Sequence, residues 1–147
     1  AEAIARRCAD AGVPESEIVV SEIGAKTTVP DAHTIVLGAP IYGGSIPRKM
    51  SSFVDANLEQ LLRARVGIFL SCLYGGERAE QQLADNFPSR LVAHSFGRYY
   101  VGGRVVFSQM RWLDRQIMKR VGGVDHDVDN VDDKEIARLV ADVTGSA

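Results

Sequence analysis

Short runs of apolar and β-branched residues recur along the chain and predict strands. Residues 34–38 and 65–72 are apolar at almost every position, a pattern typical of strands that are covered on both faces of a parallel sheet. A shorter β-branched run covers residues 18–23, and a run interrupted by glycines covers residues 98–106. The pattern therefore predicts four strands, of which two are fully buried.

Apolar residues spaced three or four positions apart predict helices between these strands. The longest stripe follows Pro47, and proline is tolerated at a helix start because its missing N–H is not needed there. A last helix is expected after Asp132, where Asp132 and Glu135 have the spacing of a capping box. The other predicted helices cover residues 1–12, 78–87, 90–93 and 110–121.

The order of these elements decides the fold class. Strands and helices alternate along most of the chain, with one defect where two strands follow each other directly. Crossovers between parallel strands are right-handed almost without exception, so this order gives a doubly wound parallel sheet with helices on both faces. We therefore predict an α/β fold in a single domain that spans residues 1–147.

Composition and charge exclude several classes of protein. Hydrophobic residues make up 46% and charged residues 24%, both ordinary for a globular domain, and the net charge of -2 gives no reason to expect nucleic acid as a partner. No apolar run approaches the ~20 residues that a transmembrane helix needs. Cys8 and Cys72 have neither metal-binding nor disulfide spacing, so a reducing cytoplasm is the expected compartment. The three histidines lie apart from one another, and no metal site is predicted.

Two loops of similar composition follow the two buried strands. Each couples a tyrosine to paired glycines, and ligands of open parallel sheets bind beyond the carboxyl ends of the strands. Glycine lets the backbone approach a flat ligand, and tyrosine offers a face for stacking. Either loop alone would be interpreted as a tight turn, but two in succession favour a site for a planar heteroaromatic ring. The candidate residues are Ala39, Pro40, Ile41, Tyr42, Gly43 and Gly44, followed by Ser71, Cys72, Leu73, Tyr74, Gly75 and Gly76.

These loops resemble those of a known family. Residues 38–44, Gly-Ala-Pro-Ile-Tyr-Gly-Gly, resemble the flavodoxin loop that lies over one face of FMN, and residues 71–76 resemble the second flavin loop of that family. The resemblance implies a flavodoxin-like fold with FMN as the cofactor. A flavin carries the redox chemistry itself, so no catalytic side chain is predicted.

Within the flavodoxin superfamily, the chain is most similar to bacterial quinone-dependent protoporphyrinogen IX dehydrogenases of the flavodoxin type. That resemblance rests on Gly-Gly-Arg at 102–104, on Arg-Trp-Leu-Asp-Arg at 111–115 with Gln-Ile-Met-Lys after it, and on Gly-Gly at 122–123. It covers residues 1–123 and implies an FMN-dependent oxidoreductase of heme biosynthesis that oxidises protoporphyrinogen IX with a quinone acceptor.

The chain departs from the family at its start. Flavodoxins bind the FMN phosphate with a loop between the first strand and the first helix, where free backbone N–H groups point at the anion. The present sequence begins after that loop, inside an apparent helix without an N-cap. We therefore expect that the usual first strand and the phosphate loop precede residue 1 in the natural polypeptide. We also expect that the sheet has a gap or a rearranged pairing, and that the chain as given binds FMN weakly. The alternative is that residue 1 begins a frayed but genuine N-terminus.

A basic stripe is the last candidate feature. Arg111, Arg115 and Lys119 repeat every four residues beside Trp112, and Arg104 precedes them. One interpretation is a surface for an anionic porphyrin, or for anionic lipid near a membrane quinone, which would place the protein peripherally on the inner face of the membrane. The other is an ordinary solvated helix face.

Two rival functions stay open at this point. The first alternative to an FMN-dependent oxidoreductase is a small electron-transfer flavodoxin with protein partners. The second is a flavodoxin-fold interaction module that no longer binds FMN. The basic stripe argues against the first rival, because electron-transfer flavodoxins usually surround the flavin with acidic residues.

Overall fold

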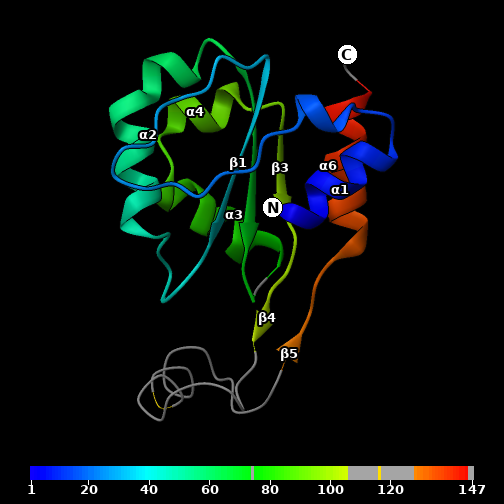
Figure 1. Ribbon diagram of the computed structural model, residues 1–147. Coiled ribbons are helices and arrows are strands. Elements are labelled where there is room, and N and C mark those ends of the chain that lie inside the picture. The colour runs from blue at the N-terminus through cyan, green and yellow to red at the C-terminus, as the bar shows by residue number, and fades with distance from the viewer. Residues whose placement is uncertain (74, 106–115, 117–127, 146–147) are drawn as a thin grey trace.

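The computed structural model describes residues 1–73, 75–105, 116 and 128–145. At its centre is a three-stranded parallel sheet in the order β1-β2-β3, with helices on both faces (Figure 1). The strands are β1 (Thr34–Pro40), β2 (Arg65–Ser71) and β3 (Gly97–Tyr100). The predicted α/β class with a parallel sheet is confirmed.

The two strands predicted as fully buried pair over their whole length. Thr34 lies opposite Arg65 at one end of the ladder, and Pro40 lies opposite Ser71 at the other. β3 adds four further register pairs on the other side of β2. Because the strands are parallel, their carboxyl ends lie at the same edge of the sheet.

The strand predicted over residues 98–106 is divided in two. β3 ends at Tyr100, and β4 (Arg104–Val105) pairs instead with β5 (Val128–Asp129) as a short antiparallel ladder. Gly102, between β3 and β4, has a φ of 71°, which no extended strand accommodates. β5 itself lies in an acidic stretch of the chain where no strand was predicted.

The strand predicted over residues 18–23 is wrong. These residues join no ladder with the described strands, and Val19 is 82% exposed and Val20 46% exposed. Their β-branched side chains favour an extended backbone, but a strand also requires a neighbour to pair with. The segment is instead attached through Ile18 and Ile23, which pack against different hydrophobic clusters.

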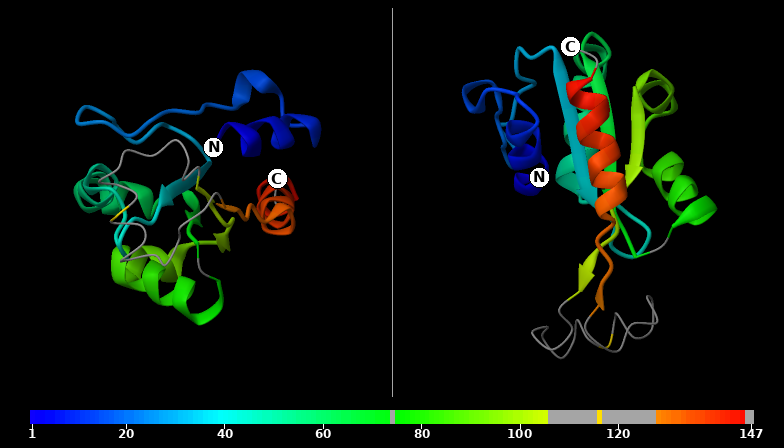
Figure 2. Two further views of the ribbon diagram at one scale, coloured as in Figure 1. Left: turned by 90° about the horizontal axis from the view of Figure 1, so that it is seen from below. Right: turned by 90° about the vertical axis from the view of Figure 1, so that its right-hand side faces the viewer.

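Helices cover both faces of the sheet, as Figures 1 and 2 show. One face carries α2 (Arg48–Leu61), α3 (Gly76–Asn86) and α4 (Ser89–His94), and the opposite face carries α1 (Glu2–Asp10) and α6 (Asp133–Thr144). A 3₁₀ turn, η1 (Glu15–Glu17), follows α1. The helices predicted at 1–12, after Pro47, at 78–87, at 90–93 and after Asp132 are confirmed, and the helix predicted at 110–121 lies outside the described residues apart from position 116.

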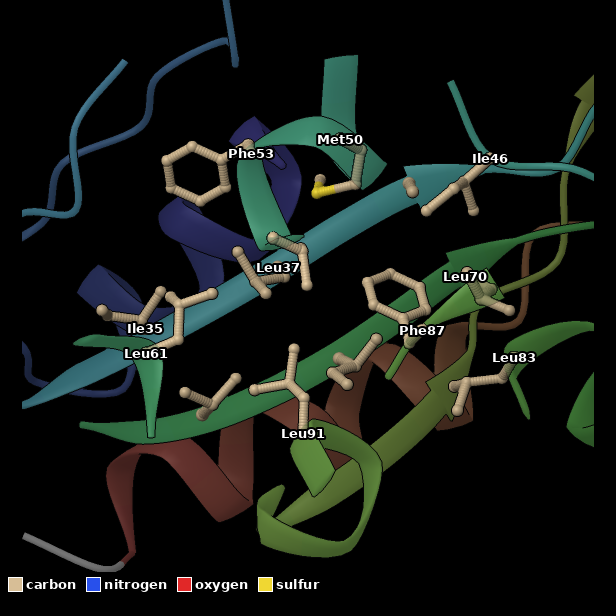
Figure 3. Packing of buried hydrophobic residues seen from close by; sticks show 14 of the residues in the cluster. Ile35, Leu37, Ile46, Met50, Phe53, Leu61, Leu70, Leu83, Phe87 and Leu91 are labelled. Atoms are coloured by element: carbon tan, nitrogen blue, oxygen red, sulfur yellow. The ribbon is translucent and has the colours of Figure 1, made fainter. Parts of the chain in front are cut away.

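Each face of the sheet has its own hydrophobic core. The cluster under α2, α3 and α4 contains Leu37, Leu61, Leu70, Leu83 and Leu91 among others, and Figure 3 shows how these side chains interdigitate. The cluster under α1 and α6 contains Ile4, Cys8, Tyr99, Val101, Ile136, Leu139 and Val140. Burial on both faces explains why β1 and β2 are continuously apolar in sequence.

The start of α6 only half fulfils the predicted capping box. The Asp132 carboxylate accepts hydrogen bonds from the backbone N–H groups of Lys134 and Glu135, at 3.0 and 3.1 Å. Glu135 does not return the bond, because the N–H of Asp132 already donates to the carbonyl of Val101 at 2.9 Å. The carboxylate of Glu135 accepts instead from the N–H of Tyr100, at 3.3 Å.

Candidate functional site

Three segments leave the sheet side by side at its carboxyl edge: residues 41–46 after β1, residues 71–73 and 75–76 at the end of β2, and residues 101–103 after β3. The ladders continue slightly beyond the strands, since Ile41 donates to the carbonyl of Ser71 at 2.9 Å and Val101 donates to the carbonyl of Leu70 at 3.0 Å. This is the edge at which the sequence predicted a ligand site.

The first segment is built around a tight turn. The N–H of Tyr42 donates to the carbonyl of Ser45 at 2.9 Å, and the N–H of Ser45 donates to the carbonyl of Tyr42 at 3.1 Å. Gly43 and Gly44 have φ values of 56° and 83°. A type I′ turn requires positive φ at both central residues, which glycine adopts without strain, and the paired bonds between Tyr42 and Ser45 close the turn. The sequence Tyr-Gly-Gly-Ser thus forms this turn because its two central glycines adopt positive φ.

The turn is open to a ligand. A Cβ placed on Gly43 or Gly44 would meet no atom within 4 Å. Tyr42, the residue before this glycine pair, is 70% exposed. An uncovered aromatic ring beside uncovered peptide groups provides both a stacking face and polar edge contacts. These residues fit a planar heteroaromatic ligand.

The turn is held in place from two sides. Ile46 is buried in the core cluster under α2, α3 and α4, where Figure 3 shows it near Leu70 and Phe87. Asn86, the last residue of α3, accepts the N–H of Ile46 at 3.0 Å and donates to the carbonyl of Gly44 at 2.9 Å. Sequence reasoning missed Asn86, because this contact spans about forty residues and no local pattern indicates it.

The second segment begins at Ser71, whose hydroxyl donates to the carbonyl of Gly102 at 2.9 Å. Gly75 and Gly76 start α3, and a Cβ on either would meet no atom within 4 Å. Tyr74 lies outside the described residues, so its part in the predicted ring-binding site stays a prediction.

Two predicted contact residues are buried in the core. Ala39 is 2% exposed and Cys72 is 4% exposed, and both side chains belong to the cluster under α2, α3 and α4. Pro40, Ile41 and Leu73 are half-buried at the edge of the sheet. The surface presented to a ligand therefore comes from Tyr42 and the glycine backbone more than from the residues before them.

The third segment was not among the residues predicted for the ligand site, since Gly102 and Gly103 were noted only for a family resemblance. Gly102 lies so close to residue 130 that a Cβ would be 1.7 Å from the carbonyl oxygen of Asn130. The N–H of Asn130 in turn donates to the carbonyl of Gly103 at 2.9 Å. Gly103 lies against Cys72 and Leu73, with a Cβ position 3.7 Å from each. Residues 101–103 are therefore fixed between the second loop and the start of α6.

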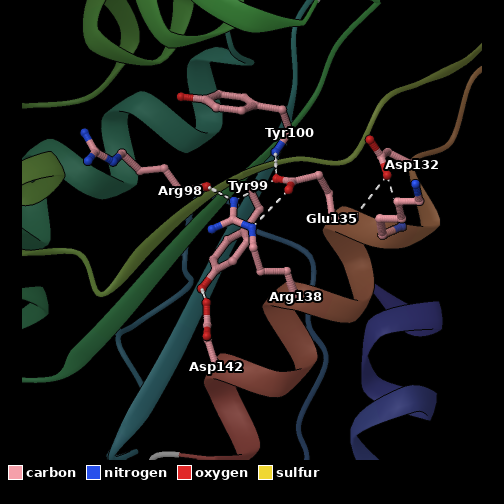
Figure 4. A network of polar contacts seen from close by, with 8 residues as sticks. Arg98, Tyr99, Tyr100, Asp132, Glu135, Arg138 and Asp142 are labelled. Carbon is pink, nitrogen blue, oxygen red and sulfur yellow. Dashed lines mark hydrogen bonds and ion pairs between the residues drawn. The ribbon is translucent and has the colours of Figure 1, made fainter.

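A polar network joins the same region to α6 (Figure 4). The hydroxyl of Tyr99 donates to Asp142 at 2.7 Å, and the guanidinium of Arg138 lies 4.4 Å from the centre of the Tyr99 ring. Arg138 also donates to the carbonyl of Arg98 and to the carboxylate of Glu135, both at 2.7 Å. Burial and the Asp142 bond raise the pKa of Tyr99 far above its usual value, while the bond from Arg138 lowers the pKa of Glu135. The network fixes β3 on α6.

The predicted basic surface is mostly beyond the described residues. Arg104 lies in β4, and Arg111, Trp112, Arg115 and Lys119 fall outside the part of the chain that the structure describes. The described residues hold no cluster of three potential metal ligands. Among the described helices, none is both long and apolar enough to span a bilayer.

Two surface hollows lie away from this edge. One, of about 450 Å³, is lined by residues 55–60 and Arg63 at the end of α2, and another, of about 480 Å³, lies between residues 1–3 and 20–22. The first is lined mainly by charged and amide side chains, and neither contains an aromatic residue. The loops at the carboxyl edge, in contrast, carry an exposed aromatic ring, Tyr42, beside open glycine backbone.

Comparison with known proteins points to one family. The family model described as "Flavodoxin domain" matches residues 1–132, which include all three segments of the site. Neither the comparison with curated proteins nor the comparison with solved structures gave a match.

Proposed function

Because the chain belongs to the flavodoxin domain family, whose members typically bind FMN, we propose that it binds FMN at the carboxyl edge formed by residues 41–46, 71–76 and 101–103. The observation that carries this proposal is the open type I′ turn, in which an exposed Tyr42 stands beside uncovered Gly43 and Gly44. The second glycine loop begins at the adjoining strand end.

Each part of the edge has a distinct role in this proposal. Tyr42 stacks on one face of the isoalloxazine ring. The glycine backbones at 43–44 and 75–76 allow close approach of peptide groups to the ring edge, since a ligand meets no side chain there. Bound FMN supplies electron-transfer chemistry, and the protein supplies binding, orientation and the electrostatic environment.

The proposed activity is that of a flavin-dependent oxidoreductase, with protoporphyrinogen IX as the reductant and a quinone as the electron acceptor. Support for this finer assignment comes from the sequence alone, namely Gly-Gly-Arg at 102–104 and the arginine- and tryptophan-containing stretch at 111–119. The basic residues at 111, 115 and 119 would attract the carboxylates of a porphyrinogen.

The cofactor proposal is tested by adding FMN to the purified protein and recording flavin fluorescence and the visible spectrum. We expect saturable quenching and shifted flavin bands. Riboflavin, which lacks the phosphate, is the matched ligand. It should bind similarly if the loops at the carboxyl edge provide most of the affinity. FMN fluorescence unchanged at millimolar protein would refute the proposal.

The substrate proposal is tested on the FMN-loaded protein without oxygen. We expect protoporphyrinogen IX to bleach the flavin bands and a quinone to restore them. Bleaching by a reduced electron-transfer protein, with none by protoporphyrinogen, would instead identify an electron-transfer flavodoxin.

A further inference from the structure

The side chain of Asn86 makes three hydrogen bonds at the end of α3. Its Nδ2 donates to the carbonyl of Gly44 at 2.9 Å and to the carbonyl of Gln82 at 2.7 Å. Its Oδ1 accepts the N–H of Ile46 at 3.0 Å. The first and third bonds reach the 41–46 loop, and the second stays within the helix.

The orientation of this amide follows from its partners. A backbone carbonyl only accepts and a backbone N–H only donates, so Nδ2 must face Gly44 and Gln82 while Oδ1 faces Ile46. Both N–H groups and the oxygen of the Asn86 side chain are therefore used.

Few other side chains fit this position. An aspartate would place a carboxylate oxygen against two carbonyl oxygens, a glutamine is one methylene longer, and an alanine or serine has no group that reaches both partners. The amide of Asn86 also bridges the peptide that ends the glycine pair and the anchor residue Ile46, so it restrains both sides of Ser45. Gly44 has no side chain to limit its backbone, and this external restraint compensates for that freedom.

We propose that Asn86 is the positioning residue of the flavin loop. It holds the carbonyl of Gly44 and the N–H of Ile46, and thereby keeps Tyr42 and Gly43 in the arrangement that receives the ring of FMN. This inference rests on the proposed function for its ligand, but the restraint on the loop exists whether or not FMN is bound.

Asn57 provides a matched control. Its Nδ2 donates to the carbonyl of Phe53, four residues earlier in α2, at 2.8 Å, just as Asn86 donates to Gln82 within α3. Asn57→Ala and Asn86→Ala each remove an intrahelical bond of this kind. Only Asn86→Ala also removes the two bonds to the loop.

The test combines amide hydrogen exchange with FMN titration of the full chain. In the ligand-free wild type we expect slow hydrogen exchange at the N–H of Ile46, which donates to Asn86, and at the side-chain amide of Asn86, which donates to the carbonyls of Gly44 and Gln82. In Asn86→Ala the exchange of Ile46 should accelerate at least about tenfold and the Kd for FMN should rise about tenfold, whereas Asn57→Ala should leave both near the wild-type values. The flavin bands of the loaded Asn86→Ala variant should also shift relative to those of the wild type.

The outcomes separate this inference from the proposed function. If the wild type binds FMN and Asn86→Ala binds it equally well with unchanged bands, the positioning role is refuted while FMN binding stands. If the wild type does not bind FMN, the proposed function fails and the role toward FMN fails with it. Should Asn86→Ala not fold, unprotected exchange of Ile46 in the wild type would refute the inference, and slow exchange together with weaker FMN binding by Asn86→Asp would support it.

Discussion

The backbone N–H of Ile41 donates to the carbonyl of Ser71 at 2.9 Å, one position beyond the last register pair of β1 and β2. This bond extends the parallel ladder past the strands and joins the starting points of the two glycine loops. Since each loop begins from this shared backbone, the geometry of one constrains the other. The relationship is the structural basis for treating both loops as one site.

Removing the Tyr42 ring should weaken FMN binding without affecting stability. Stacking of an aromatic side chain on a planar base or ring contributes ~1–2 kcal/mol, so Tyr42→Ala should raise the Kd about tenfold. Because Tyr42 is largely exposed, the melting temperature of the Tyr42→Ala variant should differ little from that of the wild type. Fluorescence titration with FMN measures the effect. Val19→Ala, which truncates another exposed apolar side chain, is the control, and equal affinity of the two variants would contradict the stacking role.

Gly102→Ala should destabilise the protein strongly. The new Cβ would be 1.7 Å from the carbonyl oxygen of Asn130, and the φ of 71° is unfavourable for alanine. Strain and displacement of residue 130 together should cost more than ~2 kcal/mol in urea unfolding. Gly12→Ala is the matched control, because Gly12 also has a positive φ but no atom within 4 Å of its Cβ position. Gly12→Ala should lower the free energy of unfolding by only ~1 kcal/mol. Similar losses in the two variants would mean that Gly102 does not closely approach residue 130.

Tyr99→Phe tests the bond between β3 and α6. The Tyr99 hydroxyl donates to the Asp142 carboxylate at 2.7 Å from a fully buried residue, so its loss should lower the free energy of unfolding by ~1–2 kcal/mol. Tyr42→Phe removes a hydroxyl from an exposed residue and should change that free energy by less than ~0.5 kcal/mol. Chemical unfolding measures both, and a Tyr99→Phe variant as stable as the wild type would show that the Tyr99–Asp142 bond drawn in Figure 4 contributes no net stability.

The ion pair between Glu135 and Arg138 predicts a specific pH dependence. The hydrogen bond from Arg138 lowers the pKa of Glu135 in the folded state. The stabilisation it brings is therefore present above the unfolded glutamate pKa of about 4.3 and is lost as the pH falls through the lower, folded pKa. For this half-exposed pair, Glu135→Gln should lower the free energy of unfolding by ~0.5–1 kcal/mol at pH 7, as measured in urea. In strong acid, where Glu135 is protonated, the substitution should change that free energy by almost nothing.

A double-mutant cycle controls that experiment. In an Arg138→Leu background, Glu135→Gln should lose most of its pH-dependent cost, because the cation that lowers the pKa is gone. A cost that persists at low pH, or that is unchanged without Arg138, would assign the effect to the hydrogen bond from Tyr100 instead.

Local pattern was enough to predict much of the fold. β1 and β2 were predicted because a strand buried on both faces leaves a continuous apolar run, and α6 was predicted because its cap residue and apolar stripe are both local. Residues 18–23 show the limit of this reasoning. Their side chains favour extension, but pairing depends on a neighbouring strand, which the segment's own residues do not encode.

The candidate site shows the same division. The 41–46 loop was predictable, because a tyrosine with two glycines directly after a buried strand restricts the turn and its location. Asn86 and the close approach of Gly102 to Asn130 were not, since each depends on contacts between segments far apart in sequence. The capping bond predicted from the N–H of Asp132 to Glu135 does not form for the same reason. Glu135 accepts instead from the N–H of Tyr100, a residue distant in sequence.

The most direct test of the central claim is to map where FMN binds, by following backbone amide chemical shifts while FMN is added to the labelled protein. We predict that the largest changes occur at Gly43, Gly44, Gly75 and Gly76, with smaller ones at Gly103. Changes confined to the hollow at residues 55–63, with the glycine amides unaffected, would contradict the assignment of the carboxyl edge as the flavin site.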